Sequence, residues 1–524
     1  RMRLPKLGLP GAAAIVLGLG LLTALPLVDH DYFWHTKVGE WIVTHRWNLP
    51  ASEPFSFTAS GVPWVVQGWL FDSLQYLLHR HFGDTGVRAL YAALIVATWS
   101  LVYASAKLYL REASRALLLT VLCAAAAAPF LSPRPLAATN LAFAFVMFAL
   151  LKHRATGARV WLAALPPVFA IWVNLHFGYI TGLALIGLFA LANLIERFAP
   201  IGGAPDEPGR LSIGLASVVV IASVAALGAN PYGWGVLTET LGMTTTNMNT
   251  NVIEWLSPDF RHWQAQLFLP PLALLFATRC LASRRAQWLD LLMALSLTGA
   301  ALYSQRHIPL ACIGLAPLLA RALASWSPGT IEYRAPAAMA KRVRGSAGRE
   351  LGALEYRLNL AFVVLAVVTA ALLQPSASAR QERRLRMVQP VEAADFVQTH
   401  RLTGPIFHDY HLGGYLLQRL HPRVPVFIDG RYNPYIGAPL QDYLTLMQLG
   451  AGWQALLEKY DIRLAVLSSP GDGLAGAMAD SGKYRLVHAD KGFGVLIRND
   501  GTRPDLPAIS AAQAASLRHE AQRP

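Results

Sequence analysis

The sequence predicts an α-helical polytopic membrane protein of about 11 transmembrane helices, with a small extracytoplasmic α/β domain near its C-terminal end. Three observations predict this fold class. Hydrophobic residues make up 54% of the 524 residues and charged residues only 15%, well below the ~25% of soluble domains. Runs of ~17–25 nearly uncharged residues recur, and this length spans a bilayer as a helix. After about residue 380 the composition becomes polar and mixed.

The apolar runs define the expected spans. They lie at about 9–28, 86–107, 116–131, 137–151, 160–175, 178–196, 212–229, 266–282, 288–303, 308–324 and 358–374. The basic start "RMRLPK" predicts a cytoplasmic N-terminus, with a cleaved signal peptide as the alternative. Alternating the spans from there places about twenty Lys and Arg residues inside and about six outside, which is a strong positive-inside bias. We therefore expect a multi-pass membrane protein with its C-terminal domain outside the cytoplasm.

The net charge of +14 follows from these inner connections, so it indicates membrane orientation rather than nucleic-acid binding. The three cysteines all fall in apolar segments without CxxC spacing, which predicts neither a disulfide framework nor a metal site. The topology also places the dense polar and aromatic segments outside. They are "DHDYFWH", "SPRP", "VNLHFGY", "ANPYGW", "NVIEWLSPDF" and "SQRH". Any chemistry is therefore expected to be extracytoplasmic.

The chain is expected to form three parts: a transmembrane domain over 1–375, an α/β domain over 381–500 and a mobile tail over 501–524. In the first part, the outer loop 29–85 is predicted to carry interfacial helices, with Trp64, Trp69 and Tyr76 as anchors. In the second, "GPIFHDYHLGGYLL" predicts strand, turn and helix, and "RVPVFIDGRYNPY" predicts a strand and a Gly turn. "WQALLEKYDIRLAVLSS" predicts a helix and a buried strand, and "YRLVHADKGFGVLIRND" predicts a hairpin.

Asp29, Asp31 and His35 are the candidate catalytic residues, because they share one short segment at the outer end of the first span. Burial or a nearby charge shifts the pKa of such a carboxylate and makes it useful as a general base. On a helix, His35 lies one turn after Asp31, on the same face. The D-x-D pair also leaves open a weak site for a divalent cation, Mg²⁺ or Mn²⁺, although no cofactor is assigned. The alternative is an acidic helix end without a role.

Polar residues at other outer boundaries are candidate substrate-binding groups. An arginine at such a boundary is suited to binding a phosphate, and its alternative role is a membrane anchor. Residues that could line the same cavity accompany the arginines. These candidates are Arg134, Asn174, His176, Glu254, Arg306 and His307. In the C-terminal domain, acids beside glycines at strand ends add Asp409, Asp429 and Arg431, with plain turn residues as the alternative. The chain has no GxGxxG, GKS/T, HExxH or GxSxG motif, so nucleotide-driven chemistry and serine hydrolysis lack support.

These segments together resemble the GT-C superfamily of membrane glycosyltransferases, which includes protein O-mannosyltransferases, the aminoarabinose transferase of lipid A and oligosaccharyltransferases. They are similar above all to uncharacterised bacterial membrane proteins of this type. The matching segments are "DHDYFWHTKVGEW", "EPFSFT", "PWVVQGWL", Arg134-Pro135, Asn174 to Gly178, Asn230 to Gly233, Glu254 to Pro258 and Asp409 to Arg431. The chain departs from the pattern at Glu53, where Asp is usual, and at Gln67, where His-Glu is common.

The resemblance implies a glycosyltransferase that moves a sugar from a polyprenyl-phosphate donor to an extracytoplasmic glycan, lipid or protein acceptor. The first-loop Asp29 or Asp31 is then the general base for an inverting attack, and Arg134, Arg306 and His307 hold the leaving phosphate. We expect these side chains to converge on one chamber. The alternative is a non-catalytic membrane component that binds a lipid-linked glycan during assembly or translocation of surface polysaccharide.

Overall fold

The computed structural model of the chain describes residues 8–110, 112–199, 207–245, 253–281, 286–324, 347–431, 433–490, 492–510 and 513. The chain divides into two compact units. Unit 1 comprises Arg1–Leu25 and Thr85–Gln374, and unit 2 comprises Pro26–Asp84 and Pro375–Pro524. The first outer loop therefore groups with the C-terminal segment, whereas the sequence-based division counted 29–85 with the transmembrane domain. Most of the tail expected over 501–524 lies outside the described residues.

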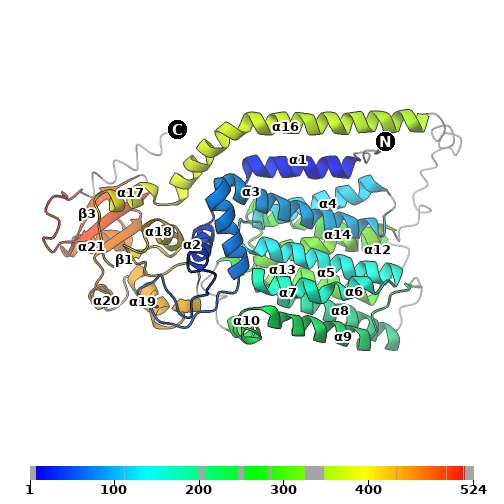
Figure 1. The fold of residues 1–524 in the computed structure, drawn as a ribbon, viewed down its shortest axis with the longest axis horizontal. Coiled ribbons are helices and arrows are strands. Elements are labelled where there is room, and N and C mark those ends of the chain that lie inside the picture. The colour runs from blue at the N-terminus through cyan, green and yellow to red at the C-terminus, as the bar shows by residue number, and fades with distance from the viewer. Residues whose placement is uncertain are drawn as a thin grey trace. The chain divides into compact units, whose positions relative to one another are not determined.

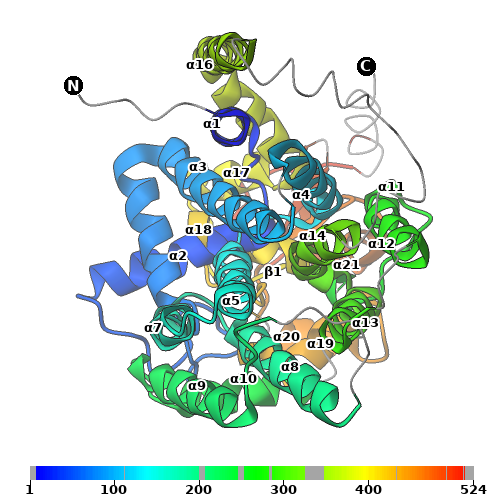
Figure 2. The ribbon, with the colours of Figure 1, turned by 90° about the vertical axis from the view of Figure 1, so that its right-hand side faces the viewer.

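Unit 1 is built from helices, which lie side by side in Figures 1 and 2. The α-helices are α1 (Leu9–Ala24), the second part of α3 (Trp69–Lys107), α4 (Ala113–Ala127), α5 (Leu136–Thr156), α6 (Val160–Ala163), α7 (Leu165–Leu175), α8 (Tyr179–Phe198), α9 (Ile213–Ala226), α10 (Gly235–Thr245), α11 (Trp263–Gln266), α12 (Leu269–Leu281), α13 (Trp288–Tyr303) and α14 (Ile308–Ala324). Short 3₁₀ turns connect some of them: η1 (Ala128–Phe130), η2 (Leu227–Ala229), η4 (Ile253–Trp255) and η5 (Gln305–His307).

Five helical segments of the described chain are long and apolar enough to cross a membrane. They are Trp69–Lys107, Ala113–Phe130, Leu136–Thr156, Tyr179–Phe198 and Gln305–Ala324. Shorter apolar helices also occur, among them Leu9–Ala24, Ile213–Ala229 and Trp288–Tyr303. The apolar runs thus predicted helices well, while the number of spans and their orientation stay predictions.

Glycines set the closest helix contacts in unit 1. A Cβ on Gly314 of α14 would lie 2.2 Å from Cδ1 of Leu297 on α13. A Cβ on Gly182 of α8 would lie 2.6 Å from the ring of Trp172 on α7. Because lipid tails are as apolar as these side chains, helices in a membrane gain little from the hydrophobic effect and depend on such close packing. The core of unit 1 therefore forms where small residues let neighbouring helices approach.

Unit 2 contains a four-stranded sheet in the order β1-β2-β4-β3. Its strands are β1 (Ile406–His408), β2 (Leu464–Ser468), β3 (Tyr484–Ala489) and β4 (Phe493–Arg498). The strands β1 and β2 are parallel, and β4 is antiparallel to both β2 and β3. The expected hairpin is present, but the strand expected from "RVPVFIDG" is wrong, because Val426 makes only isolated bridges to Ser56 and Ile406.

Helices surround this sheet in unit 2. They are α2 (His30–Thr44), the first part of α3, α17 (Val391–Thr399), α18 (Gly413–Leu420), α19 (Ala438–Met447), α20 (Trp453–Lys459) and α21 (Gly473–Asp480), with 3₁₀ turns η6 (Tyr410–Leu412) and η7 (Asn433–Tyr435). Two helices cross the division between the units: α16 (Ala347–Val388) and α3, which kinks at Gly83. Gly83 has φ 58°, a left-handed conformation that glycine adopts without steric cost.

Candidate functional site

The two aspartates at the start of α2 make different contacts. Asp29 has an extended backbone, and its Oδ1 accepts a hydrogen bond from the backbone N–H of Asp31 at 2.9 Å. It is therefore the N-cap of α2, a position where a carboxylate satisfies helix N–H groups and complements the helix dipole. Asp31 instead accepts a hydrogen bond from Nε1 of Trp34 at 3.0 Å. Local geometry thus separates two acids that the sequence left equivalent.

Glycines of the C-terminal segment pack tightly against this start of α2. A Cβ on Gly430 would lie 2.0 Å from Oδ1 of Asp31 and 2.8 Å from Nε1 of Trp34. A Cβ on Gly414, at the start of α18, would lie 2.7 Å from the carbonyl oxygen of His30. Helix α18 packs on α2 along this contact (Figure 1). The segments "GGYLL" and "DGR" therefore fit closely around the candidate catalytic acids.

His35 is paired with an acid that the sequence analysis missed. Its Nδ1 lies 2.7 Å from Oδ1 of Asp72, on the first turn of α3, and Asp72 is only 1% exposed. The His35 ring stacks on Trp34 with the ring centroids 3.5 Å apart. Beside Asp72 on the same buried face, Gln75 donates to the carbonyl of Tyr32. Two polar residues three apart in the otherwise apolar segment "WLFDSLQYLL" are the signal that could have revealed this pair.

Arg431 lies in a fully buried ion cluster of unit 2. Its Nε and Nη2 contact the two oxygens of Asp429 at 2.8 and 2.6 Å, and its Nη1 lies 2.6 Å from Oε1 of Glu53. The hydroxyl of Tyr435 donates to Oδ2 of Asp429 at 2.9 Å. Burial alone would lower the pKa of Arg431, but the neighbouring Asp429, Tyr435 and Glu53 raise it well above its usual value. The arginine is therefore a permanent cation that neutralises buried carboxylate charge.

Aromatic rings of the first loop enclose the same guanidinium. Its central carbon lies 4.8 Å from the ring centroid of Trp64 and 4.9 Å from that of Phe55. Glu53 also accepts hydrogen bonds from the backbone N–H groups of Phe55 and Ser56, so this residue, which replaces the usual Asp, still caps the turn. Trp64 is 8% exposed, so the expectation that it is a membrane anchor is wrong. Substrate binding by Asp429 and Arg431 stays a prediction.

Asp409 follows β1 and holds the neighbouring strand. Its Oδ2 accepts a hydrogen bond from the backbone N–H of Ser468, the last residue of β2, at 2.7 Å. The next residue before it, His408, is fully buried, and its Nδ1 lies 2.9 Å from the carbonyl oxygen of Asp409. Burial lowers the pKa of His408, while the charges of Asp409 and Asp429 act in the opposite direction. A role of Asp409 in substrate binding also stays a prediction.

In unit 1, Arg134 and Glu254 come together from distant segments and form an ion pair. Their side chains are 18% and 39% exposed, so solutes can reach the pair. Glu254 lies on η4, which is held to the start of η5 because its carbonyl oxygen accepts a hydrogen bond from the hydroxyl of Ser304 at 3.1 Å. The segments "SPRP", "EWLSP" and "SQRH" therefore meet within unit 1.

Arg306, on η5, is held by aromatic faces. Its guanidinium carbon lies 5.1 Å from the ring centroid of Trp255 and 5.3 Å from that of Phe177. Such cation–π contacts stabilise a cation without neutralising it. The Nδ1 atom of the next residue, His307, is buried and makes no hydrogen bond to any described residue. Cationic and imidazole groups thus lie together at the start of α14.

The candidates His176 and Asn174 close the turn between α7 and α8. Nδ1 of His176 lies 2.8 Å from the hydroxyl of Thr139 and accepts a hydrogen bond from the backbone N–H of Gly178 at 3.1 Å. Asn174 donates to the carbonyl of Ala170, and its side-chain oxygen accepts from Asn230 at 3.3 Å. Both residues are largely buried, and these contacts explain "VNLHFG" and "ANPYGW" as a joined pair of helix ends.

A small, partly open pocket lies between α3, η1, α5 and α14. Its lining is mostly apolar and includes Trp99, Phe130, Ile313 and Asn140. Asn140 is 5% exposed, and its side-chain oxygen has no hydrogen-bond partner among the described residues. Ser132 also lines the cavity, and its carbonyl oxygen accepts the backbone N–H of Arg134 at 2.8 Å. A mostly apolar pocket with one unsatisfied amide is therefore lined by Ser132, two residues before Arg134.

The divalent cation suggested for Asp29 and Asp31 fits these contacts poorly. One oxygen of each carboxylate already accepts a hydrogen bond, from Asp31 N–H and from Trp34. Within the part of the chain that the structure describes, no group of three or more His, Cys, Asp or Glu side chains is arranged to hold a metal ion. We therefore derive no chemical step through a metal.

The sequence-predicted residues thus form separate groups within each unit. In unit 2, Asp29, Asp31 and His35 share α2, which packs against the segment carrying Asp409, Asp429 and Arg431. In unit 1, Arg134 pairs with Glu254, and the start of α14 contributes Arg306 and His307. The convergence of all these side chains on one chamber stays a prediction.

No protein-family model and no curated protein matches the chain. It is similar to the solved structure of the Archaeoglobus fulgidus oligosaccharyltransferase in the apo form, with 11% identity, 94% of this chain and 74% of that chain covered, and a TM-score of 0.49. It is also similar to ArnT from Cupriavidus metallidurans (17% identity, 93% and 97% covered, TM-score 0.48). A third similar structure is the arabinofuranosyltransferase AftD from Mycobacteria (15% identity, 93% and 39% covered, TM-score 0.47).

Because every TM-score is below 0.5, the proposals below rest on the chain's own residues.

Proposed function

We propose that this chain is a membrane glycosyltransferase that moves a sugar from a polyprenyl-phosphate donor to an acceptor outside the cytoplasm. The observation that carries the proposal is the mostly apolar pocket of unit 1 that is lined by Ser132, two residues before Arg134. A polyprenyl phosphate is a long apolar chain that ends in an anion. An apolar cavity next to a solvent-accessible arginine has complementary chemistry for both parts.

The ion pair of Arg134 and Glu254 supports reversible binding of the phosphate. Both side chains reach solvent, so an exposed pair of this kind contributes little stability and exchanges at low cost. An arriving phosphate gives Arg134 a bidentate partner with more charge than a carboxylate. Arg306, whose guanidinium lies over the rings of Trp255 and Phe177, supplies a second positive charge for the growing charge of the leaving group.

The acceptor hydroxyl needs a base, and the start of α2 supplies the candidates. The resemblance to GT-C enzymes implies Asp29 or Asp31 in this role. Asp29 caps α2, which leaves Asp31 and His35 as the side chains for proton transfer. The acceptor oxygen then attacks C1 of the sugar with inversion as the polyprenyl phosphate leaves. The acceptor bound by unit 2 is a glycan, a lipid or a protein, and the sequence places this chemistry on the periplasmic face.

The test uses the purified full chain in lipid nanodiscs. Polyprenyl-phosphate-linked hexoses and pentoses are supplied with a cell-envelope extract as acceptor, and released polyprenyl phosphate is measured. We expect release by the wild type and a loss of about 10²–10⁴ in rate on Asp31→Asn or His35→Gln, whichever is the base. Binding of these donors without release, in wild type and variants alike, would replace the enzyme with the alternative, a non-catalytic component of surface polysaccharide assembly or translocation.

A further inference from the structure

The strongest unexplained feature of unit 2 is a buried acid–imidazole pair. Nδ1 of His35 lies 2.7 Å from Oδ1 of Asp72, and the two side chains are 11% and 1% exposed. Taking a carboxylate out of water is costly, and an apolar residue of similar size would serve packing at least as well. A purely structural role therefore does not account for the choice of Asp at position 72.

Three neighbours fix the position of this pair. A Cβ on Gly39, four residues after His35 on α2, would lie 2.0 Å from the carbonyl oxygen of Asp72. Only glycine at position 39 therefore lets α3 approach α2 closely enough for the two side chains to meet. Trp34 stacks on one face of the imidazole, and its own N–H is held by Asp31 at 3.0 Å. The ring of His35 is thus restrained along its edge and its face.

The hydrogen bond to Asp72 also determines which nitrogen of His35 carries the proton. A carboxylate only accepts, so the neutral imidazole donates its Nδ1–H to Asp72 and presents its lone pair at Nε2. The hydrogen bonds that the structure describes leave Nε2 without a protein partner. An imidazole held in this tautomer by a buried carboxylate is arranged to accept a proton at Nε2.

We propose that Nε2 of His35 takes the proton of the acceptor hydroxyl, and that Asp72 is a positioning residue that fixes His35 in the required tautomer. This inference rests on the glycosyl transfer proposed above and assigns its base. As the acceptor O–H bond breaks, the proton moves to Nε2 and the oxygen forms a bond to C1 of the sugar. The bond from C1 to the phosphate oxygen breaks, and its electron pair leaves with the polyprenyl phosphate. Asp72 stabilises the imidazolium that results.

Asp31 is the competing candidate for this role. Its Oδ1 already accepts the Trp34 N–H, whereas Nε2 of His35 has no hydrogen-bond partner among the described residues. Asp31 accepts the indole N–H of Trp34, and Trp34 stacks on the imidazole of His35. Asp31 therefore helps to position His35. Substitution of Asp31 is therefore expected to reduce the rate less than substitution of His35.

The first experiment measures the tautomer directly in the full chain. Protein labelled with ¹⁵N-histidine is placed in nanodiscs, and the ring ¹⁵N shifts of His35 are assigned by loss of the signal in His35→Gln. We expect the wild type to carry its proton on Nδ1. In Asp72→Asn the side-chain amide donates to Nδ1, so the proton is expected to move to Nε2. A wild type protonated on Nε2 would overturn the proposal, whether or not Asp72→Asn folds.

The second experiment measures release of polyprenyl phosphate. Asp72→Asn is expected to lower kcat by about 10²–10⁴ with little change in KM, and Asp72→Glu is expected to restore part of the rate. The matched control is Asp84→Asn, which disrupts a His–Asp pair at the surface. In this pair, Nδ1 of His79 lies 3.6 Å from Oδ1 of Asp84, and the two side chains are 37% and 41% exposed. Full activity in Asp72→Asn, or a larger loss in Asp31→Asn than in His35→Gln, would overturn the assignment. A wild type that releases nothing would refute the proposed function instead, and the tautomer experiment would still decide the role of Asp72.

Discussion

The arginines at the starts of helices α5 and α14 make different contacts from the arginines in the last turns of the same helices. Arg134 precedes α5 and Arg306 precedes α14, while Arg154 and Arg321 lie in the last turns of the same two helices. At the ends with Arg154 and Arg321, every guanidinium nitrogen has an acceptor. At the starts, Arg134 forms an ion pair with the exposed carboxylate of Glu254, and Arg306 lies over aromatic rings.

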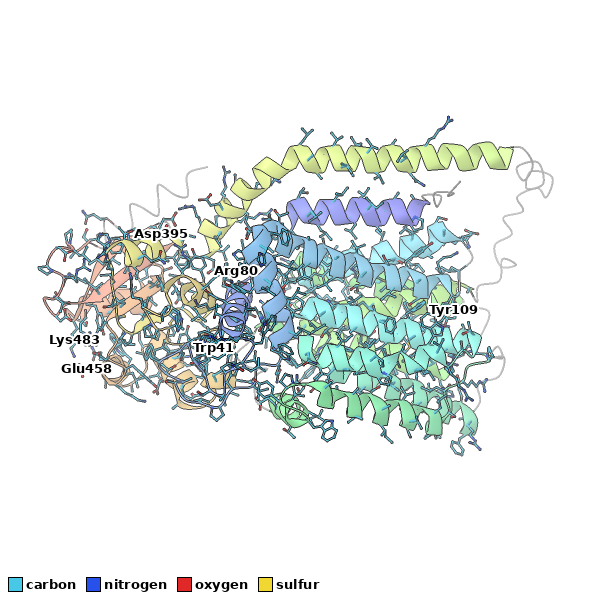
Figure 3. All side chains as sticks on the ribbon, in the orientation of Figure 1. Trp41, Arg80, Tyr109, Asp395, Glu458 and Lys483 are labelled. Carbon is cyan, nitrogen blue, oxygen red and sulfur yellow. The ribbon has the colours of Figure 1, made fainter. Side chains whose placement is uncertain are left out.

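The end with Arg154 and Arg321 is a sealed ion network. Glu207 contacts both arginines, and Gln287 accepts a hydrogen bond from each of them. Asp290 lies 2.7 Å from Nε of Arg321, whose Nη1 donates to the hydroxyl of Tyr109 at 3.0 Å. Figure 3 labels Tyr109 at this end of the unit 1 helices. Both guanidinium groups are fully paired here, although Oε1 of Glu196 and Nη2 of Arg279 in the same network are buried without a hydrogen bond to a described residue.

The opposite end also contains buried polar atoms without a hydrogen-bond partner in the described part of the chain. Among the described residues, Nδ1 of His307 and the side-chain oxygen of Asn140 are buried and make no hydrogen bond. Unsatisfied buried groups cost about 1–3 kcal/mol each, so a fold retains them only where something else compensates. The difference between the ends lies in the arginines: Arg154 and Arg321 are buried in an ion network, whereas Arg134 and Arg306 are the residues that we propose to bind the phosphate.

The sealed end predicts the largest effect. Arg321→Met removes one of the two arginines that pair with Glu207 and one of the two that pair with Asp290 in a buried setting, and we expect a loss of about 3–5 kcal/mol in unfolding free energy. Thermal unfolding of the protein in detergent measures it. The control is Arg115→Met, which removes an ion pair to Glu112 whose side chains are 67% and 59% exposed and which is expected to cost less than about 0.5 kcal/mol. Equal losses in the two variants would remove the distinction between the ends.

The open end predicts the converse result. Arg134→Gln is expected to lower the rate of polyprenyl phosphate release by about 10²–10³ because it removes charge stabilisation of the leaving group. Its exposed pair with Glu254 contributes only about 0–1 kcal/mol, so the unfolding temperature is expected to change little. A variant that is destabilised as much as Arg321→Met yet fully active would show that Arg134 is structural.

The sequence predicted the local elements of this fold well. The run 288–303 corresponds to α13 and the run 308–324 to α14, because apolar length alone determines where such helices lie. The hairpin of β3 and β4 followed from its pattern in the same way. The strand expected near Val426 failed, since its neighbours are Ser56 and Ile406 and its backbone pairs only as isolated bridges.

Contacts between distant segments could not be predicted. Nothing in the local pattern of Glu53 or Arg431 indicates that they form one buried pair. Asp72 looks like an ordinary polar residue in a helix, and its importance depends on His35, which lies on another helix. Glycine at positions 39 and 430 fits an ordinary helix or turn pattern. In the structure, a Cβ at either position would clash with a residue of a neighbouring segment. Such contacts require the three-dimensional packing.

The cavity beside the open end gives a third and smaller test. In Asn140→Leu an apolar side chain replaces the amide whose oxygen has no partner in the described chain. Removing an unsatisfied buried acceptor is expected to stabilise unit 1 by up to about 1–2 kcal/mol. If the amide contacts a donor molecule, the same variant is expected to raise KM for polyprenyl-phosphate sugars several-fold. Thermal unfolding and steady-state kinetics measure both. Asn140→Leu with unchanged stability and kinetics would mean that this amide is neither strained nor used.

The smallest expected effect concerns a histidine of unit 2. Arg431 there is paired with carboxylates, whereas Nε2 of His408 is buried without a hydrogen-bond partner among the described residues. Burial lowers the pKa of His408 from its ordinary value of 6.5, so the folded chain keeps the ring neutral while the unfolded chain binds a proton. Unfolding therefore takes up a proton as pH falls below about 6.5, and the stability of unit 2 is expected to decline there. Burial also lowers the pKa of His411, His421 and His488, which adds to the same dependence of stability on pH.

Denaturant unfolding at pH 7.5 and 5.5 measures the difference in stability, and His408→Gln is expected to make that difference smaller. A slope that is unchanged in His408→Gln would show that the unfolded chain gains no proton at this residue.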